Sequence, residues 1–228
     1  MSLAPSGAPT DPRMHASRSI ANTVVLVRHA PTSWTGRRWC GRADPPLTAV
    51  GRRVARDLAD EIVSELGERE APSGACSDRH AVRLLVSPAR RARQTASPIE
   101  LALGLDAVID PDLVEVDVGA AEGLEWTALE RRFPLVAAAI ARREQPDWPA
   151  GETASEVRRR ADRAIERILA AALGGPVVVV SHGAILHAIA ALVVLDPRSL
   201  TGLGPAAYLR VDPLTVVATE PGSAGEWR

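Results

Sequence analysis

The stretch VVLVRHA, residues 24–30, decides the fold of this chain. Its first four residues are apolar and mostly β-branched, which is typical of a buried parallel strand. Arg28 and His29 follow directly at the end of that strand. In open α/β sheets, ligands bind in the crevice beyond the carboxyl ends of the strands. The stretch therefore predicts a strand that carries a cation and a potential nucleophile to a ligand-binding edge.

A second stretch, RLLVSPARRARQTA at residues 83–96, predicts another short strand that runs straight into a helix. Ser87 is expected to cap this helix. Arg91 then lies near the positive N-terminal end of the helix, where a guanidinium can grip an anion bidentately. Arg90 and Arg93 are expected to face solvent.

Two further stretches bring polar groups to strand ends. In VVVVSHG, residues 177–183, a continuous apolar strand ends on His182. Gly183 allows close approach of a ligand to the backbone, and its amide opens a helix whose dipole favours an anion. In LVEVDVG, residues 113–119, Glu115 supplies a carboxyl group on a loop after another predicted strand.

In this order, the four stretches resemble the motifs of the histidine phosphatase superfamily, in its phosphoglycerate-mutase-like branch. The likeness extends from Thr23 to about Tyr208. It includes two shorter matches, DPPLTAVG at residues 44–51 and GETASEV at residues 151–157. The resemblance implies an α/β fold: a single three-layer α/β/α domain with a mostly parallel central sheet.

The resemblance also implies roles for the residues at the strand ends. His29 is expected to be the nucleophile that forms a phosphohistidine, and Glu115 the proton donor to the leaving oxygen. Arg28, Arg91 and a protonated His182 would surround the phosphate oxygens with positive charge. Nearby guanidinium groups lower the pKa of the nucleophilic histidine and so favour its neutral form. Asp117, two residues beyond the expected proton donor, stays open as the alternative acid.

Departures from the family pattern bear on substrate binding and on the reaction. Thr35 stands where many members have an asparagine that helps to hold the phosphate, although its hydroxyl can still form hydrogen bonds. The resemblance places Gly41 and Gly183 with it among the substrate-binding residues. Mutases of the family tend to have threonine where Cys40 stands and a different sequence after the acidic residue Glu115. These differences favour a phosphatase over a mutase.

The sequence thus predicts an enzyme: a metal-independent phosphomonoesterase that acts on a small phosphorylated metabolite. No metal and no other cofactor are expected, because arginines supply the positive charge. One alternative is a phosphoglycerate-type mutase, which returns the phosphoryl group to an isomeric hydroxyl. Others are a non-catalytic protein of the same fold that binds a phosphorylated ligand, and a nucleotide-binding module, which lacks its glycine-rich fingerprint here. The substrate itself stays open.

Composition narrows the class of protein further. With 228 residues and a formal net charge of -1, the chain fits one domain and gives no basic footprint for nucleic acid or an anionic membrane. Residues 177–195 are long enough to span a bilayer, but polar residues interrupt them and a strand-turn-helix is expected instead. The two cysteines are too few for a disulfide framework, which favours a reduced cytoplasmic location. The oligomeric state stays open, a homodimer included.

The domain is expected to cover residues 21–220. Residues 1–20 lack the apolar core of a secretory signal and are expected to form a disordered tail, and residues 221–228 form a second tail. Residues 119–151 contain aromatic residues and proline-interrupted short helices, and are predicted to form a lid. Their aromatic side chains could pack a small satellite core or contact the pocket.

Two long helices carry clear boundary signals. Thr48 is expected to cap a helix whose apolar residues recur every fourth position, and Gly67 to end it. Thr153 and Glu156 form a predicted capping box for a second amphipathic helix. The three arginines at positions 158–160 are expected on the solvent-exposed face of this helix.

Overall fold

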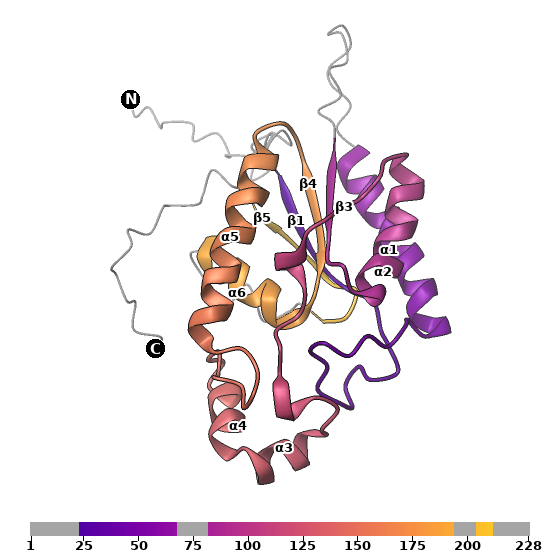
Figure 1. The fold of residues 1–228 in the computed structure, drawn as a ribbon. Coiled ribbons are helices and arrows are strands. Elements are labelled where there is room, and N and C mark those ends of the chain that lie inside the picture. The colour runs from indigo at the N-terminus through magenta and orange to yellow at the C-terminus, as the bar shows by residue number, and fades with distance from the viewer. Residues whose placement is uncertain (1–22, 68–81, 194–203, 212–228) are drawn as a thin grey trace, which may run out of the picture.

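The computed structural model of this chain describes residues 23–67, 82–193 and 204–211. Within these residues, a sheet of five strands in the order β3-β2-β4-β1-β5 lies between two layers of helices (Figure 1). The strands are β1 (Val24–Arg28), β2 (Arg83–Val86), β3 (Val108–Ile109), β4 (Val177–Ser181) and β5 (Tyr208–Val211). The first four are parallel and β5 is antiparallel to β1. The predicted three-layer α/β/α fold with a mostly parallel sheet is confirmed.

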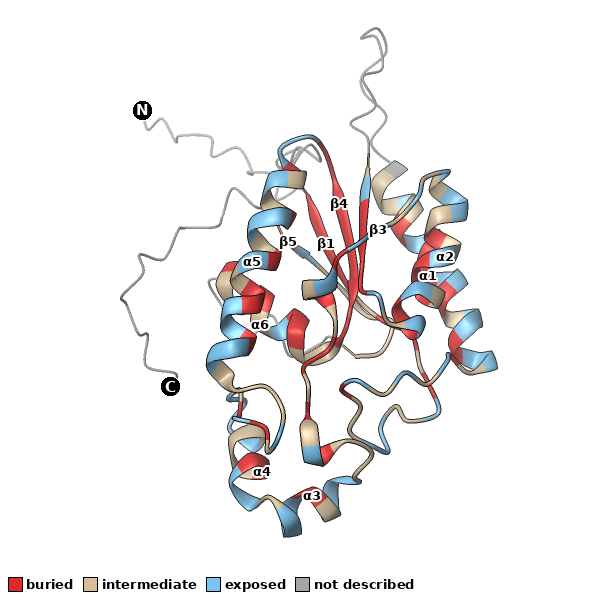
Figure 2. Ribbon diagram, in the orientation of Figure 1, coloured by how far each residue is buried: buried red, intermediate tan, exposed pale blue. Residues whose placement is uncertain are grey.

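The central strands are buried on both faces, which explains their unbroken apolar sequences. Side chains of β1 alternate between the two faces of the sheet. Val25 and Val27 pack into the core beneath α1 (Ala49–Gly67) and α2 (Arg90–Leu103), while Leu26 packs into the core beneath α5 (Ala154–Ala172) and α6 (Gly183–Val193). Figure 2 shows the buried strands between helices whose inner faces are buried and whose outer faces are exposed.

The register of β1 and β4 brings the two histidine-bearing strand ends together. Val24 pairs with Val177 and Arg28 pairs with Ser181, so the two strands end level with each other. β2 lies on the other side of β4, and its Val86 pairs with Val180. The carboxyl ends of three parallel strands therefore meet at one edge of the sheet.

Helices α1 and α5 begin at the caps that the sequence predicts, whereas α2 does not. The Thr48 hydroxyl accepts the Gly51 amide at 2.9 Å at the start of α1. The capping box of Thr153 and Glu156 forms at the start of α5. Helix α2 begins at Arg90 and has no side-chain cap, so the prediction that Ser87 caps it is wrong. Ser87 is instead fully buried at the end of β2.

The predicted exposure of the arginines on α5 holds for two of the three. Arg158 and Arg159 are exposed. Arg160 is only 6% exposed, which contradicts the expectation. It lies three residues after the buried Val157, on the inner face of the helix, and its charge is paired there with Glu152 at 2.8 Å. A buried guanidinium is tolerated in this position because it is paired and hydrogen-bonded.

The segment between η1 (Pro111–Leu113) and α5 lies beyond the carboxyl ends of the strands (Figure 1). It contains η2 (Gly119–Ala121), α3 (Trp126–Arg132) and α4 (Pro134–Ala141), as expected of short helices interrupted by proline. The ring of Trp39 lies 5.9 Å from that of Trp126 and 5.5 Å from that of the buried Trp148, between centroids. Trp148 and Trp39 belong to the core beneath α5 and α6, and Trp126 is 39% exposed, so these rings extend that core and do not form a separate one.

Several expectations fall outside the described residues or stay predictions. The tails at residues 1–20 and 221–228 lie outside them, and motion of the 119–151 segment stays a prediction. None of the helices within the described ranges is both long and apolar enough to cross a membrane.

Candidate active site

Two buried histidines face each other where β1 and β4 end. His29 is 7% exposed and His182 is fully buried, and their ring centroids are 5.1 Å apart in an edge-to-face arrangement. The main chains are joined at this point, since the His29 amide donates to the Ser181 carbonyl at 2.9 Å. The observed register of β1 and β4 thus places both histidines in one site, at the sheet edge where the sequence predicts them.

The ring of His29 is held in one tautomer. Its Nδ1 lies 2.9 Å from the carbonyl oxygen of Ala30, which can only accept, so Nδ1 carries the proton. Nε2 then keeps its lone pair and accepts the Nε–H of Arg91 at 3.3 Å. Burial lowers the pKa of His29 to about 3; the Ala30 hydrogen bond opposes this shift, and the charges of Arg91 and Arg28 add to it. His29 is therefore a neutral ring with an available nitrogen at neutral pH.

This shift makes folding stability depend on pH. A histidine in the unfolded chain titrates near 6.5, so between that pH and about 3 the unfolded chain binds a proton that folded His29 does not. The stabilising contribution is fully present above pH 6.5 and is lost as the pH falls towards 3. Between about pH 6 and about pH 4, His29→Gln should reduce the slope of the unfolding free energy by up to about 1.4 kcal/mol per pH unit. Urea unfolding of both proteins across this range tests it, and equal slopes would show that His29 titrates normally.

His182 is also neutral in this arrangement. Its Nδ1 accepts the Nε–H of Arg91 at 3.1 Å, and its Nε2 lies 2.7 Å from the hydroxyl of Ser87. Burial, with smaller contributions from Arg91 and the other nearby charges, holds the pKa of His182 well below its usual range. The proton of the neutral ring therefore resides on Nε2 and is donated to Ser87. The sequence does not indicate this role, because Ser87 also fits a helix-capping pattern.

Arg91 connects the two histidines and is almost completely buried, at 1% exposure. Besides the two Nε contacts, its Nη1 donates to the Ala43 carbonyl at 2.7 Å and its Nη2 to the Gly41 carbonyl at 3.0 Å. Asp44 lies 3.4 Å from Nη1. The sequence predicts that the Arg91 guanidinium grips an anion through two nitrogens. That prediction needs correction, because both terminal nitrogens also hold the loop at residues 41–44. Arg90 and Arg93 are exposed, as predicted.

Gly41 and Gly183 are both sites of close approach. A Cβ on Gly41 would lie 2.5 Å from the carbonyl oxygen of Val116, so no larger residue fits without a shift. A Cβ on Gly183 would lie 3.2 Å from the guanidinium carbon of Arg28. Both glycines therefore pack the loops and the helix start tightly around the site, and substrate contact stays a prediction for both.

Arg28 is mostly buried beside Glu115. Burial lowers the pKa of Arg28, and the negative charge of Glu115 opposes that shift. The interaction shows that this cation and the expected proton donor lie near each other. Since Arg28 packs against Gly183 and ends β1, its charge is placed at the same sheet edge as His29.

Glu115 lies at the N-terminus of α6, where backbone amides fix its carboxyl group. Oε1 accepts the amides of Val116 at 2.9 Å and Ile185 at 3.2 Å, and Oε2 accepts that of Ala184 at 3.3 Å. The side chain is buried, at 8% exposure. The three amides therefore fix the position of the carboxyl group.

Asp117, the alternative acid, has a different environment. Its Oδ1 accepts the Gly119 amide at 2.9 Å, and its side chain is 40% exposed, with Arg42 at 3.8 Å. Its local hydrogen bond is typical of a turn-forming aspartate. Glu115 differs from Asp117 in being buried and in lying near Arg28, and the choice of Glu115 as the proton donor stays a prediction.

Thr35 lies in the turn that follows β1. Its hydroxyl accepts the Thr32 amide at 2.9 Å and is 3.3 Å from the Thr32 hydroxyl. It therefore closes this turn from its far end, while the Thr32 hydroxyl forms the serine/threonine-type turn by accepting the Trp34 amide at 3.2 Å. The predicted contact of Thr35 with a phosphate stays a prediction.

These features define an α/β protein with two buried histidines at the edge of a mostly parallel sheet, and comparison with known proteins identifies its family. Residues 24–212 match the model of the histidine phosphatase superfamily, branch 1. The chain therefore belongs to this superfamily, as the sequence motifs predict.

Its relatives include proteins named for different reactions. The chain is 34% identical over 177 residues to the "Bifunctional protein Rv2228c" of Mycobacterium tuberculosis, which covers 77% of this chain but 45% of that protein. It therefore spans about half the length of that relative. It is 32% identical over 170 residues to the "Metal-independent phosphoserine phosphatase" of Arabidopsis thaliana, covering 73% of this chain and 66% of that protein. Among solved structures, a phosphoglycerate mutase from Thermus thermophilus matches with a TM-score of 0.60 and 29% identity, over 83% of this chain and 92% of that one.

Proposed function

We propose that this protein hydrolyses the phosphomonoester of a small metabolite through a phosphohistidine on His29, without a metal ion. The observation that carries the proposal is the neutral ring of His29, whose Nδ1–H is held by the Ala30 carbonyl. Its remaining nitrogen, Nε2, is therefore unprotonated and carries the lone pair that a nucleophile requires; in the free protein this lone pair accepts the Nε–H of Arg91 at 3.3 Å, a hydrogen bond that attack on phosphorus must break. The half-buried Arg28 and the buried Arg91 supply the charge that a phosphoryl group needs at that edge.

The first step forms one bond and breaks another at phosphorus. Nε2 of His29 attacks, the bond from phosphorus to the ester oxygen breaks, and that oxygen takes the proton of Glu115. An alcohol leaves, and phosphohistidine remains. In the second step, a water attacks phosphorus, Glu115 accepts its proton, and the P–N bond breaks to release phosphate and the neutral ring. The buried carboxyl thus serves as acid and then as base.

His182 changes its protonation state when phosphate binds. In the free protein, its Nδ1 accepts a hydrogen bond from Arg91. A phosphate oxygen needs a donor in its place, so the ring takes up a proton at Nδ1 when the dianion binds. The Nε2–H stays with Ser87, whose 2.7 Å contact fixes the ring in both states. Phosphate binding at neutral pH is therefore coupled to proton uptake.

A phosphate-release assay over a panel of small phosphomonoesters, run with and without a chelator, tests this function. We expect release of inorganic phosphate that exhaustive chelation leaves unchanged, together with inhibition by vanadate, which can adopt the five-coordinate geometry of the transition state. An activity lost on chelation and restored by a divalent ion would contradict the metal-free mechanism. Formation of an isomeric phosphoester without phosphate release would identify a mutase instead.

Arg91→Lys is expected to be far from conservative. Lysine offers a point charge where Arg91 contacts two histidines and two carbonyls at once. We expect kcat/KM to fall by about 10²-fold or more. The control Arg90→Lys should stay within about twofold, because the Arg90 side chain is exposed. Steady-state kinetics with one substrate compare the two, and equal losses would show that Arg91 is not the arginine of the site.

A further inference from the structure

Arg160 of α5 is buried and directs its donors at the loop that carries Glu115. Its Nη1 donates to the carbonyl oxygens of Asp112 at 2.7 Å and Val114 at 2.6 Å. Its Nη2 lies 3.5 Å from the carbonyl of Glu115 itself. The three contacted carbonyls belong to a stretch of four residues that ends on the expected proton donor. One guanidinium thus supplies donors to several carbonyls that no regular strand or helix satisfies.

Glu152 completes the contact on the other side of the same loop. Its carboxylate receives Nε and Nη2 of Arg160, both at 2.8 Å, in a bidentate pair. The oxygen that accepts Nη2 also accepts the amide of Asp117 at 2.8 Å, and the backbone amide of Glu152 donates to the Asp117 carbonyl at 2.9 Å. Although burial raises the pKa of Glu152, hydrogen bonds from Arg160 and the Asp117 amide and nearby positive charge lower it overall, so the pair is ionic. The two side chains therefore hold the loop both before and after Glu115.

We propose that Arg160, together with Glu152, is a positioning residue that sets the orientation of the Glu115 carboxyl group for proton transfer to the leaving oxygen. This inference rests on the proposed function, because it requires Glu115 to be the proton donor. The amides at the start of α6 fix the carboxyl group of Glu115, and the pair of Arg160 and Glu152 fixes its backbone. A proton donor must be placed within a few tenths of an ångström to be effective.

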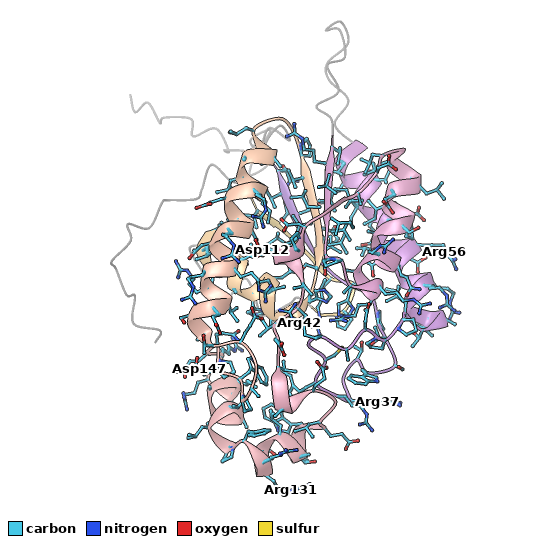
Figure 3. The ribbon with its side chains drawn as sticks, in the orientation of Figure 1. Arg37, Arg42, Arg56, Asp112, Arg131 and Asp147 are labelled. Atoms are coloured by element: carbon cyan, nitrogen blue, oxygen red, sulfur yellow. The ribbon has the colours of Figure 1, made fainter. Side chains whose placement is uncertain are left out.

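Arg42 links the pair of Arg160 and Glu152 to the part of the site that contains the two histidines. Arg42 lies 3.6 Å from Glu152 and 3.8 Å from Asp117. Its neighbours Gly41 and Ala43 give the carbonyls that hold Arg91. Figure 3 shows Arg42 at the level where the strands end, with Asp112 beside α5. Arg160 and Glu152 also line an open, polar pocket of about 430 Å³, so the pair borders this pocket as well as the loop.

The test compares Arg160→Met with the control Arg158→Met, which changes an exposed arginine two residues earlier on the same helix. Single-turnover phosphorylation rates are measured with an alkyl phosphate and with p-nitrophenyl phosphate, whose leaving group needs no proton. Arg160→Met should slow the alkyl reaction by about tenfold or more and the nitrophenyl reaction by less than about threefold. Arg158→Met should slow neither. A purely structural loss would slow both substrates alike, and that result would overturn the proposal.

Two further measurements separate this proposal from the proposed function. In a Glu115→Gln background, Arg160→Met should cause no additional loss, because it acts through the group already removed. Multiplying losses would overturn the inference and leave the function intact. If Glu115→Gln itself shows no leaving-group dependence, the assignment of the proton donor fails, and the role of Arg160 with it. Should Arg160→Met not fold, Arg160→Lys keeps the charge beside Glu152 but cannot span the carbonyls, and must show the same selectivity for the alkyl substrate.

Discussion

Glu115→Gln is expected to slow the phosphorylation step for alkyl phosphates by roughly 10²–10⁴-fold. An alkoxide leaves poorly without a proton, whereas p-nitrophenolate leaves well unaided, so the loss for p-nitrophenyl phosphate should be much smaller. The measurement is the single-turnover rate for both substrates. Steady-state rates are unsuitable, because loss of the same residue as a base slows dephosphorylation for every substrate.

The control for this prediction is Asp117→Asn, which changes the neighbouring exposed carboxyl. It should leave the ratio of the two phosphorylation rates unchanged. Glutamine at position 115 keeps one oxygen for the Val116 and Ile185 amides but brings an NH₂ group towards the Ala184 amide. Thermal unfolding of each variant must therefore confirm that rates are measured on folded protein. Leaving-group dependence in Asp117→Asn, and not in Glu115→Gln, would assign the acid to Asp117.

His29→Ala is expected to abolish turnover for good and poor leaving groups alike. The Nδ1 of His29 is fixed on the Ala30 carbonyl, and its unprotonated Nε2 lies beside Arg91, so the substitution removes the nitrogen that attacks phosphorus. We expect losses on the order of 10⁴-fold or more, the scale seen when an enzyme loses its nucleophile. Retention of the p-nitrophenyl reaction at more than a few per cent of the wild-type rate would show that water attacks directly, with His29 in another role.

The sheet edge could be predicted from sequence because local pattern determines it. Each β-branched run is long enough to be a buried strand, and each ends on a polar pair, Arg28 with His29 and Ser181 with His182. Parallel strands align their carboxyl ends, so the meeting of these groups follows from topology. Glu115 is placed near them only through the family resemblance, because the loop after β3 has no regular periodicity.

Contacts between distant segments could not be predicted from local patterns. Ser87 fits a helix cap in the sequence, but its contact with His182 joins residues 95 positions apart. Arg160 belongs to a run of three arginines that is typical of a solvated face. Helical spacing contains the missing signal, since position 160 falls three residues after the buried Val157 and so turns inward. The charged partner at Glu152 then explains why an arginine can occupy an inner position.

Rapid quenching of the protein during turnover of a ³²P-labelled phosphomonoester tests the central claim most directly. The account predicts a phosphoenzyme that is labile in acid and stable in base, with the label on His29 and absent from the His29→Ala protein. A label that persists in His29→Ala, or that maps to a serine or cysteine, would contradict it.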